Sequence, residues 1–349
     1  MRTSMQAKLR GILAATCWLL QVLPSAHADE VADFYRGKTL SIVVAHEAGT
    51  GFDVYARAFA RYLGRHIPGQ PTVIVQNMPG AGGLNATAWL YNIAPKDGTT
   101  IATIVHAIML DHQLGDKRGK YEAAKFSYIG NMERSVATCV VTATSGVSSL
   151  DDLMRRETIF GGVSRAGALS QGTLALIHLL GAKIKLVEGY KGSANLRLAM
   201  QRGEIDGMCG IPVSTLKKQW RSDMETGAFK VIVQLNEKPR PELGGAAMLA
   251  SFARSDEDRQ VFDLIFGALV LGRMYLALPD IPPPRLAALR AAFDAAIKDP
   301  EFLADAAKSQ MEITPQSGAE VQSLIERFTS APAAIVKRAR LAIGVDQAN

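Results

Sequence analysis

The sequence lacks the patterns that would place it in several common classes of protein. It has no long run of lysine and arginine and no basic–aromatic pattern, so we expect no nucleic-acid partner. No Gly-x-Ser-x-Gly motif occurs, which argues against a serine hydrolase of that type. The pair His106 and His112 has no glutamate or cysteine framing it, so we expect no metal and no cofactor. After residue 28, no uncharged apolar run reaches the roughly 18 residues of a membrane-spanning helix.

The first 28 residues have the three parts of a secretory signal peptide. Arg2, Lys8 and Arg10 form a basic start, residues 11–23 are apolar, and the segment ends in an Ala-x-Ala pattern at Ala28. We therefore predict cleavage near Ala28 and export to an oxidising compartment. Cleavage removes three basic residues and no acidic one, so the net charge falls from +6 to +3.

Two cysteines remain after cleavage, Cys139 and Cys209, and both lie in segments that look like strands. They are able to form one disulfide. We favour the interpretation that both are buried thiols, which behave as small apolar residues. The distance between the cysteines in sequence says nothing about their geometry.

The chain contains two successive units in which short apolar strands alternate with helices. In the first unit, strands are expected at residues 40–45, 72–76 and 100–105, with helices at 53–66 and 84–93. Continuous Val/Ile runs are typical of parallel strands covered on both faces. The second unit has expected strands at 137–143, 158–163, 183–187, 205–210 and 230–234. The last third is expected to be mostly helical. This pattern predicts an α/β protein with two lobes whose glycine loops face one cleft.

The most informative segment is residues 40–105, where two strands each end at a glycine cluster from which a helix begins. Such a turn directs backbone N–H groups and the positive end of a helix at one place, which suits an anion. Two alternatives are a dinucleotide site and glycines needed only for tight turns. The second cluster lacks the Gly-x-Gly-x-x-Gly spacing, and no acidic residue closes the next strand. Asp53 is expected to cap its helix. His106 is either a ligand contact at the edge of the cleft or a structural histidine, and Asp206 is either a ligand contact or a structural residue.

The chain resembles the extracytoplasmic solute receptors of tripartite tricarboxylate transporters, the Bug family. The resemblance covers essentially the whole chain after the signal peptide. It rests on residues 42–57 (IVVAHEAGTGFDVYAR), 75–83 (VQNMPGAGG), 94–100 (APKDGTT), 126–130 (FSYIG), 189–192 (GYKG) and 200–206 (MQRGEID), which occur in the family's order.

This resemblance implies a type II periplasmic-binding-protein fold, with two α/β lobes joined by crossing strands and a ligand cleft between them. The implied division is lobe 1 at residues 29–131 plus 241–349 and lobe 2 at 132–240. In such receptors the first two glycine loops hold a carboxylate and the second lobe selects the rest of the ligand. Together with the residue-based argument for His106, the candidate binding residues are Ala48, Gly49, Thr50, Gly51, Asp53, Pro79, Gly80, Ala81, Gly82, Gly83 and His106, and, in the second lobe, Ser164, Gly167, Ser170, Tyr190, Lys191 and Asp206.

The first loop departs from the family pattern, which usually has a proline and a glycine pair. This chain has instead Ala45, His46 and Glu47, followed by Gly49, Thr50 and Gly51. The function expected from the resemblance is a periplasmic, monomeric solute-binding protein that catalyses no reaction. It would capture a small organic acid and deliver it to integral membrane transporter subunits. The alternatives are an exported hydrolase or lyase that uses His46, Glu47 or His106 in the same cleft, and a ligand-sensing subunit for a signalling partner.

Overall fold

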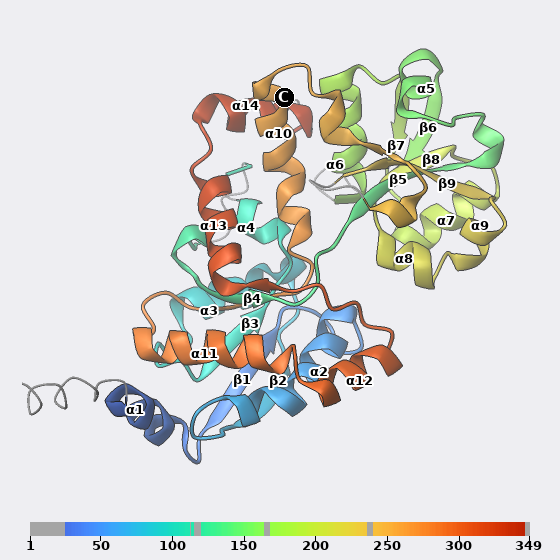
Figure 1. Ribbon diagram of the computed structural model, residues 1–349. Helices are drawn as coiled ribbons and strands as arrows, with labels where there is room; N and C mark the ends of the chain where they lie inside the picture. Colours follow the sequence, from blue (N-terminus) through green and yellow to red (C-terminus); the bar gives the residue numbers. More distant parts are fainter. Residues whose placement is uncertain (1–24, 112, 115–119, 164–167, 236–239, 346–349) are drawn as a thin grey trace, which may run out of the picture.

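The computed structural model describes residues 25–111, 113–114, 120–163, 168–235 and 240–345. The described chain forms two six-stranded sheets, which lie in two separate parts of the molecule (Figure 1). The strand orders are β12-β4-β11-β3-β1-β2 and β10-β9-β5-β8-β6-β7.

The first sheet is built around the strand–loop–helix unit predicted from the sequence. Its strands are β1 (Thr39–Val44), β2 (Thr72–Asn77) and β3 (Thr100–Thr103), and its helices are α2 (Gly51–His66) and α3 (Leu84–Asn92). Both β2 and β3 pair with β1 in parallel, as the continuous apolar runs predicted. All four residues of β3 are buried.

Three further strands complete this sheet, and they come from distant parts of the chain. These are β4 (Ser127–Asn131), β11 (Met274–Ala277) and β12 (Gln316–Ser317). Strand β11 lies antiparallel between β3 and β4. It was not predicted, because it is four residues long and lies in a region whose pattern is mainly helical. Between the sheet and the helices of this lobe lies an aromatic core. It includes Phe59, Tyr275 and Phe293.

The second sheet combines parallel and antiparallel pairs. Strands β6 (Thr158–Gly161) and β7 (Ile184–Val187) are parallel, and β8 (Gly207–Pro212) is parallel to β6. Strand β5 (Ala137–Thr142) is antiparallel to both β8 and β9 (Phe229–Gln234). The short edge strand β10 (Ala247–Met248) pairs with β9.

The other helices cover the sheets or link them. They are α1 (Ser25–Tyr35), α4 (Ala107–Asp111), α5 (Leu150–Arg155), α6 (Ala168–Ala175, continued by a π-helical segment, Leu176–Leu180), α7 (Ser193–Gln201), α8 (Val213–Lys218), α9 (Arg221–Glu225), α10 (Asp256–Phe266), α11 (Pro283–Ala296), α12 (Pro300–Lys308), α13 (Gly318–Thr329) and α14 (Ala333–Ala342). Short 3₁₀ helices lie at Ala81–Gly83, Ala123–Lys125, Ala143–Ser145, Pro241–Leu243, Leu249–Phe252 and Gly267–Val270.

Two chain segments cross between the sheets side by side. The Ser135 N–H donates to the Val270 carbonyl, the Gly272 N–H donates to the Glu133 carbonyl, and Arg134 and Leu271 form an antiparallel bridge. Helices α10 and α14 pack against each other (Figure 1). They share a buried apolar cluster with the second sheet. The lobe boundaries at residues 131/132 and 240/241 remain a prediction.

Cys139 and Cys209 form a disulfide, so the interpretation as two free thiols was wrong. The two cysteines are direct partners across the antiparallel pair β5 and β8, with Cα atoms 4.0 Å apart. Both are fully buried. The bond is compatible with the oxidising compartment that the signal peptide predicts.

The predicted signal peptide lies almost wholly outside the described residues, and α1 already includes Ala28. Within the described residues, every helix is too short or too polar to cross a membrane.

Candidate functional site

The carboxyl ends of β1, β2, β3 and β4 meet at one edge of the first sheet. Strand β11 runs the opposite way, so the residue before its start, Arg273, lies at this same edge. In the strand order, β1 stands between β2 and β3, so the chain goes from β1 to β2 on one side and then returns past β1 to β3 on the other side. Ligands of open α/β sheets bind at such a switch point. His46 follows β1 and His106 follows β3, which places both beside it.

The first glycine loop presents backbone N–H groups at the start of a long helix. Thr50 precedes α2, but its side chain does not cap the helix and its hydroxyl donates instead to the Glu47 carbonyl. The first N–H groups of α2 therefore have no acceptor within their own helix. Ala48, Gly49 and Gly51 are exposed and Thr50 is half-buried. The N-terminus of α2, which carries a partial positive charge, is therefore accessible to an anion.

Asp53 ties the first loop to the second strand. Its carboxylate accepts hydrogen bonds from Gly49 N–H at 2.9 Å, from Arg57 Nε at 2.9 and 3.0 Å, and from Asn77 Nδ2 at 2.9 Å. Asn77 Nδ2 also donates to the His46 carbonyl. Asp53 is only 3% exposed, and despite its burial these donors lower its pKa to about 2. It stands in the first turn of α2 and bonds back to Gly49, so it braces the loop without occupying the cap position.

The second glycine loop has a backbone that favours glycine. Gly80, Ala81, Gly82 and Gly83 all have positive φ angles, of 128°, 49°, 65° and 102°. A Cβ on Gly83 would lie 2.8 Å from the Ile108 side chain, whereas a Cβ on Gly82 would have none of the described atoms within 4 Å. Gly83 is thus needed for packing. Pro79, Gly80, Ala81 and Gly82 are exposed at the same edge of the sheet as the first loop.

Arg273 lies against the first turns of α2, and the sequence analysis missed it. Its guanidinium carbon is 4.5 Å from the ring centre of Phe52 and 5.0 Å from that of Tyr55. Its Nε is 3.6 Å from a carboxylate oxygen of Glu133. No local pattern marks Arg273, because it is brought here only by the antiparallel insertion of β11.

His46 and His106, the two histidines near Arg273, have lowered pKa values, which favour their neutral forms. Burial, and then the nearby Arg273 charge, lower the pKa of His46, and the same two causes lower the pKa of His106 to about 4. The His46 ring stacks on Phe52 with ring centres 4.3 Å apart. Its Nε2 is buried and has no hydrogen-bonding partner among the described residues, so no carboxylate there orients this histidine as a general base.

Five of the six second-lobe candidates fall into three groups. Ser164 and Gly167 lie outside the described residues. Tyr190 and Lys191 lie in the loop after β7, next to the end of β6, because Tyr190 N–H donates to the Gly162 carbonyl. Ser170 is fully buried, and its hydroxyl lies against the backbone of Gly162, 2.2 Å from where a Cβ would stand.

Asp206 lies at the opposite end of the second sheet from these loops. Its carboxylate accepts a hydrogen bond from the Ile159 N–H at 2.8 Å, near the start of β6. Parallel strands β6 and β8 both run away from this point, so the loop with Tyr190 and Lys191 lies at the far end of the sheet. The placement favours the structural role for Asp206, and we leave it out of the proposed site.

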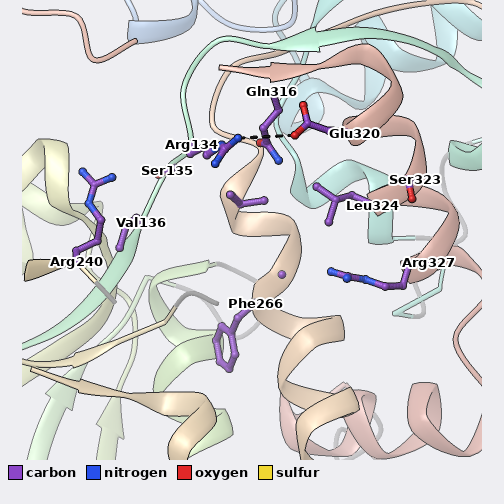
Figure 2. Close-up of a pocket in the computed structure, with 12 residues that line it drawn as sticks. Arg134, Ser135, Val136, Arg240, Phe266, Gln316, Glu320, Ser323, Leu324 and Arg327 are labelled. Atoms are coloured by element: carbon purple, nitrogen blue, oxygen red, sulfur yellow. Dashed lines mark ion pairs between the residues drawn. The ribbon is translucent and has the colours of Figure 1, made fainter. Parts of the chain in front are cut away.

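A separate cavity of about 530 Å³ lies beside the crossing segments, towards the β12–β4 side of the first sheet (Figure 2). None of the predicted binding residues that the structure describes lines it. Its arginines are engaged in ion pairs: Arg134 with Glu320, Arg240 with Glu312, and Arg327 with Asp263. Among the described residues there is also no group of three or more histidine, cysteine and acidic side chains able to hold a metal ion.

Comparison with known proteins gives one consistent result. The family described as tripartite tricarboxylate transporter family receptor (TctC) matches residues 56–341. The "UPF0065 protein in gbd 5′ region" of Cupriavidus necator is 27% identical over 237 residues, which are 65% of this chain and 68% of that protein.

Two solved structures show the same fold. A TctC solute binding protein from Polaromonas has a TM-score of 0.68 at 17% identity, covering 90% of this chain and 99% of its own. MatC from Rhodopseudomonas palustris, solved with bound malate, has a TM-score of 0.57 at 16% identity, covering 88% and 99%. The predicted two-lobed periplasmic-binding-protein fold is confirmed.

Proposed function

Because the chain belongs to the tripartite tricarboxylate transporter receptor family, as the sequence resemblance predicted, we propose that it is a periplasmic receptor for a small organic acid. It captures the acid by its carboxylate group and delivers it to the integral membrane subunits of a tripartite transporter. It binds its ligand without transforming it, and it acts as a monomer after cleavage of the signal peptide near Ala28.

The observation that carries this proposal is the convergence of three anion-attracting features at one sheet edge. The uncapped start of α2 and the exposed second loop offer backbone N–H groups, and Arg273 adds a fixed positive charge. The malate bound to MatC, a protein of the same fold, supports a carboxylate as the ligand class. In the site we include the exposed first and second loops, His106, Tyr190 and Lys191, with Ser164 and Gly167 as predicted additions.

The second lobe would close over the ligand from its own loops. The ends of β6 and β7 are held together by hydrogen bonds from Gly189 and Tyr190 N–H groups to the carbonyls of Val163 and Gly162. This leaves Lys191 exposed in a short, braced loop. Closure of two lobes about crossing segments excludes water from a bound anion and strengthens its hydrogen bonds.

A thermal-shift screen of the mature protein against organic acids tests the proposal. A ligand at 100 times its dissociation constant should stabilise the protein by about 2.7 kcal/mol. Recovery of the acid unchanged after incubation separates a receptor from a hydrolase or lyase. Stabilisation by neutral sugars but by no carboxylate would contradict the proposal.

The chain offers a matched pair of variants for the second loop. Gly82 and Gly181 both have positive φ (65° and 77°), and a Cβ at either position would meet no atom of the described residues within 4 Å. Valine at either position costs a similar backbone strain of about 1–2 kcal/mol. Only Gly82→Val should reduce stabilisation by the acid, because Gly181 follows the π-helical segment away from the loop. Equal ligand stabilisation of the two variants would remove the second loop from the site.

A further inference from the structure

Arg273 is held in one orientation by contacts on several sides. Its Nη1 donates to the Gly272 carbonyl at 2.6 Å, and its guanidinium rests against the rings of Phe52 and Tyr55. Its side chain is 20% exposed and that of its ion-pair partner Glu133 is 4% exposed. A guanidinium fixed in this way has a defined direction for each of its remaining N–H groups.

The Nη2 atom of Arg273 points at the first residue of α2. A Cβ built on Gly51 would lie 2.8 Å from Nη2. Gly51 has no positive φ angle, so its backbone conformation does not require glycine. The absence of a side chain at Gly51 therefore leaves room for the guanidinium beside the helix start. No described residue accepts a hydrogen bond from Nη2.

Arg273 brings a positive charge to this edge, whereas Arg57, on α2, is paired with Asp53. His46 and His106 are disposed to be neutral, because burial and Arg273 itself lower the pKa of each. Glu133 faces the Nε side of the guanidinium, away from the Nη1 contact with Gly272. Gly51 is exposed, and Nη2 of Arg273 and the first backbone N–H groups of α2 both lie close to it.

We propose that Arg273 is the charge-selecting residue of the binding site, with Nη2 donating to a carboxylate oxygen that the first amides of α2 also hold. The inference rests on the proposed function, since it takes the ligand to be a carboxylate. In this proposal, Arg273 makes the site prefer a carboxylate to the corresponding neutral amide. Arg273 lies more than 200 positions after the first glycine loop in the sequence. Gly51 is the positioning residue that gives the guanidinium access.

The test measures dissociation constants by calorimetry for malate, succinate, glutarate and benzoate, each beside its uncharged amide. The variants are Arg273→Met, Arg273→Lys and the double variant Arg273→Met/Glu133→Gln, which removes the buried ion pair as a whole. Arg285→Met is the matched control. Arg285 also lies over an aromatic ring, that of Phe34 at 3.5 Å, and donates to the Asp97 carbonyl, but at the amino end of β3.

Loss of a hydrogen bond to a charged group predicts that Arg273→Met weakens binding of the best acid by about tenfold to a hundredfold. Lysine should recover part of this loss, and Arg285→Met should bind as the wild type does. Gly51→Ala should weaken acid binding in the wild-type background and have little further effect in Arg273→Met, since its methyl group acts by displacing Nη2.

The outcomes separate this inference from the proposed function. If the wild type binds an acid and both Arg273→Met and the double variant bind it within twofold of the wild type, Arg273 has no part in selection and the receptor function stands. If the wild type binds no acid, both proposals fail. If Arg273→Met does not fold, the double variant decides, and Gly51→Ala, which keeps every charge, gives an independent answer.

Discussion

Replacement of Asp53 by asparagine tests the polar network that holds the two glycine loops together. The carboxylate is almost fully buried and accepts hydrogen bonds from Gly49, Arg57 and Asn77. Folding lowers its pKa from 3.8 to about 2. At about 1.4 kcal/mol per pKa unit, this difference corresponds to roughly 2.4 kcal/mol of stability at neutral pH. Arg57 is half-exposed, so solvent screening reduces the expected loss to about 1–2 kcal/mol.

The pH dependence of this loss has a defined sign. Because the folded protein binds the Asp53 proton less tightly than the unfolded chain does, the carboxylate contributes its full stability above the unfolded pKa. The contribution is complete above about pH 5, falls to about half at pH 3, and disappears as the pH drops through about 2. The difference in stability between wild type and Asp53→Asn should therefore shrink over the same range.

Urea unfolding at pH 7, 5, 4 and 3 measures this difference. Asp33→Asn is the control, because Asp33 on α1 forms an exposed ion pair with Arg36, just after the helix, and should contribute close to nothing. Asp53→Asn should also reduce acid binding, since the first loop loses its anchor at Gly49. Equal stability of wild type and Asp53→Asn at pH 7, or a difference that does not change with pH, would refute this account.

Three further predictions concern stability. Removing the disulfide with Cys139→Ser/Cys209→Ser should cost about 4 kcal/mol on the chain-entropy model, since the two cysteines are 70 positions apart, and denaturant unfolding with and without a reductant measures it. Gly130→Ala should destabilise by about 1–3 kcal/mol, because a Cβ would lie 2.2 Å from the buried Phe293 ring; an unchanged melting temperature would contradict this packing. Ser317→Ala should cost about 1 kcal/mol by removing the capping box at the start of α13, to be compared with Ser317→Asp, which keeps a capping acceptor.

Much of the fold could be predicted because its signals are local. The alternation of apolar strand, glycine loop and amphipathic helix over residues 40–105 specifies β1, α2, β2, α3 and β3, and these elements form as expected. The parallel pairing could also be predicted, since strands joined by helices and covered on both faces have continuous apolar sequences. The antiparallel strand β11 escaped prediction because four buried residues carry no periodicity that separates them from a helical segment.

The candidate site was predictable only in its backbone. The glycine clusters mark both loops directly, because glycine relieves strain at positive φ and lets another chain approach closely. The disulfide partners, the bracing of Asp53 by Asn77 and the location of Asp206 all depend on which distant segments lie side by side. Asp206 illustrates the limit: its sequence context left a ligand contact and a structural role both open, and only strand direction, which puts it at the other end of the sheet, favours the structural role.

The sequence by itself determined that two α/β units carry glycine loops suited to an anion, because strand and helix periodicity and glycine clusters are properties of neighbouring residues. Only the tertiary structure decided that Arg273 stands beside Gly51 at the start of α2 and that Cys139 pairs with Cys209. Those contacts join residues 222 and 70 positions apart, and such pairs meet only when burial of apolar surface and strand pairing bring whole segments together.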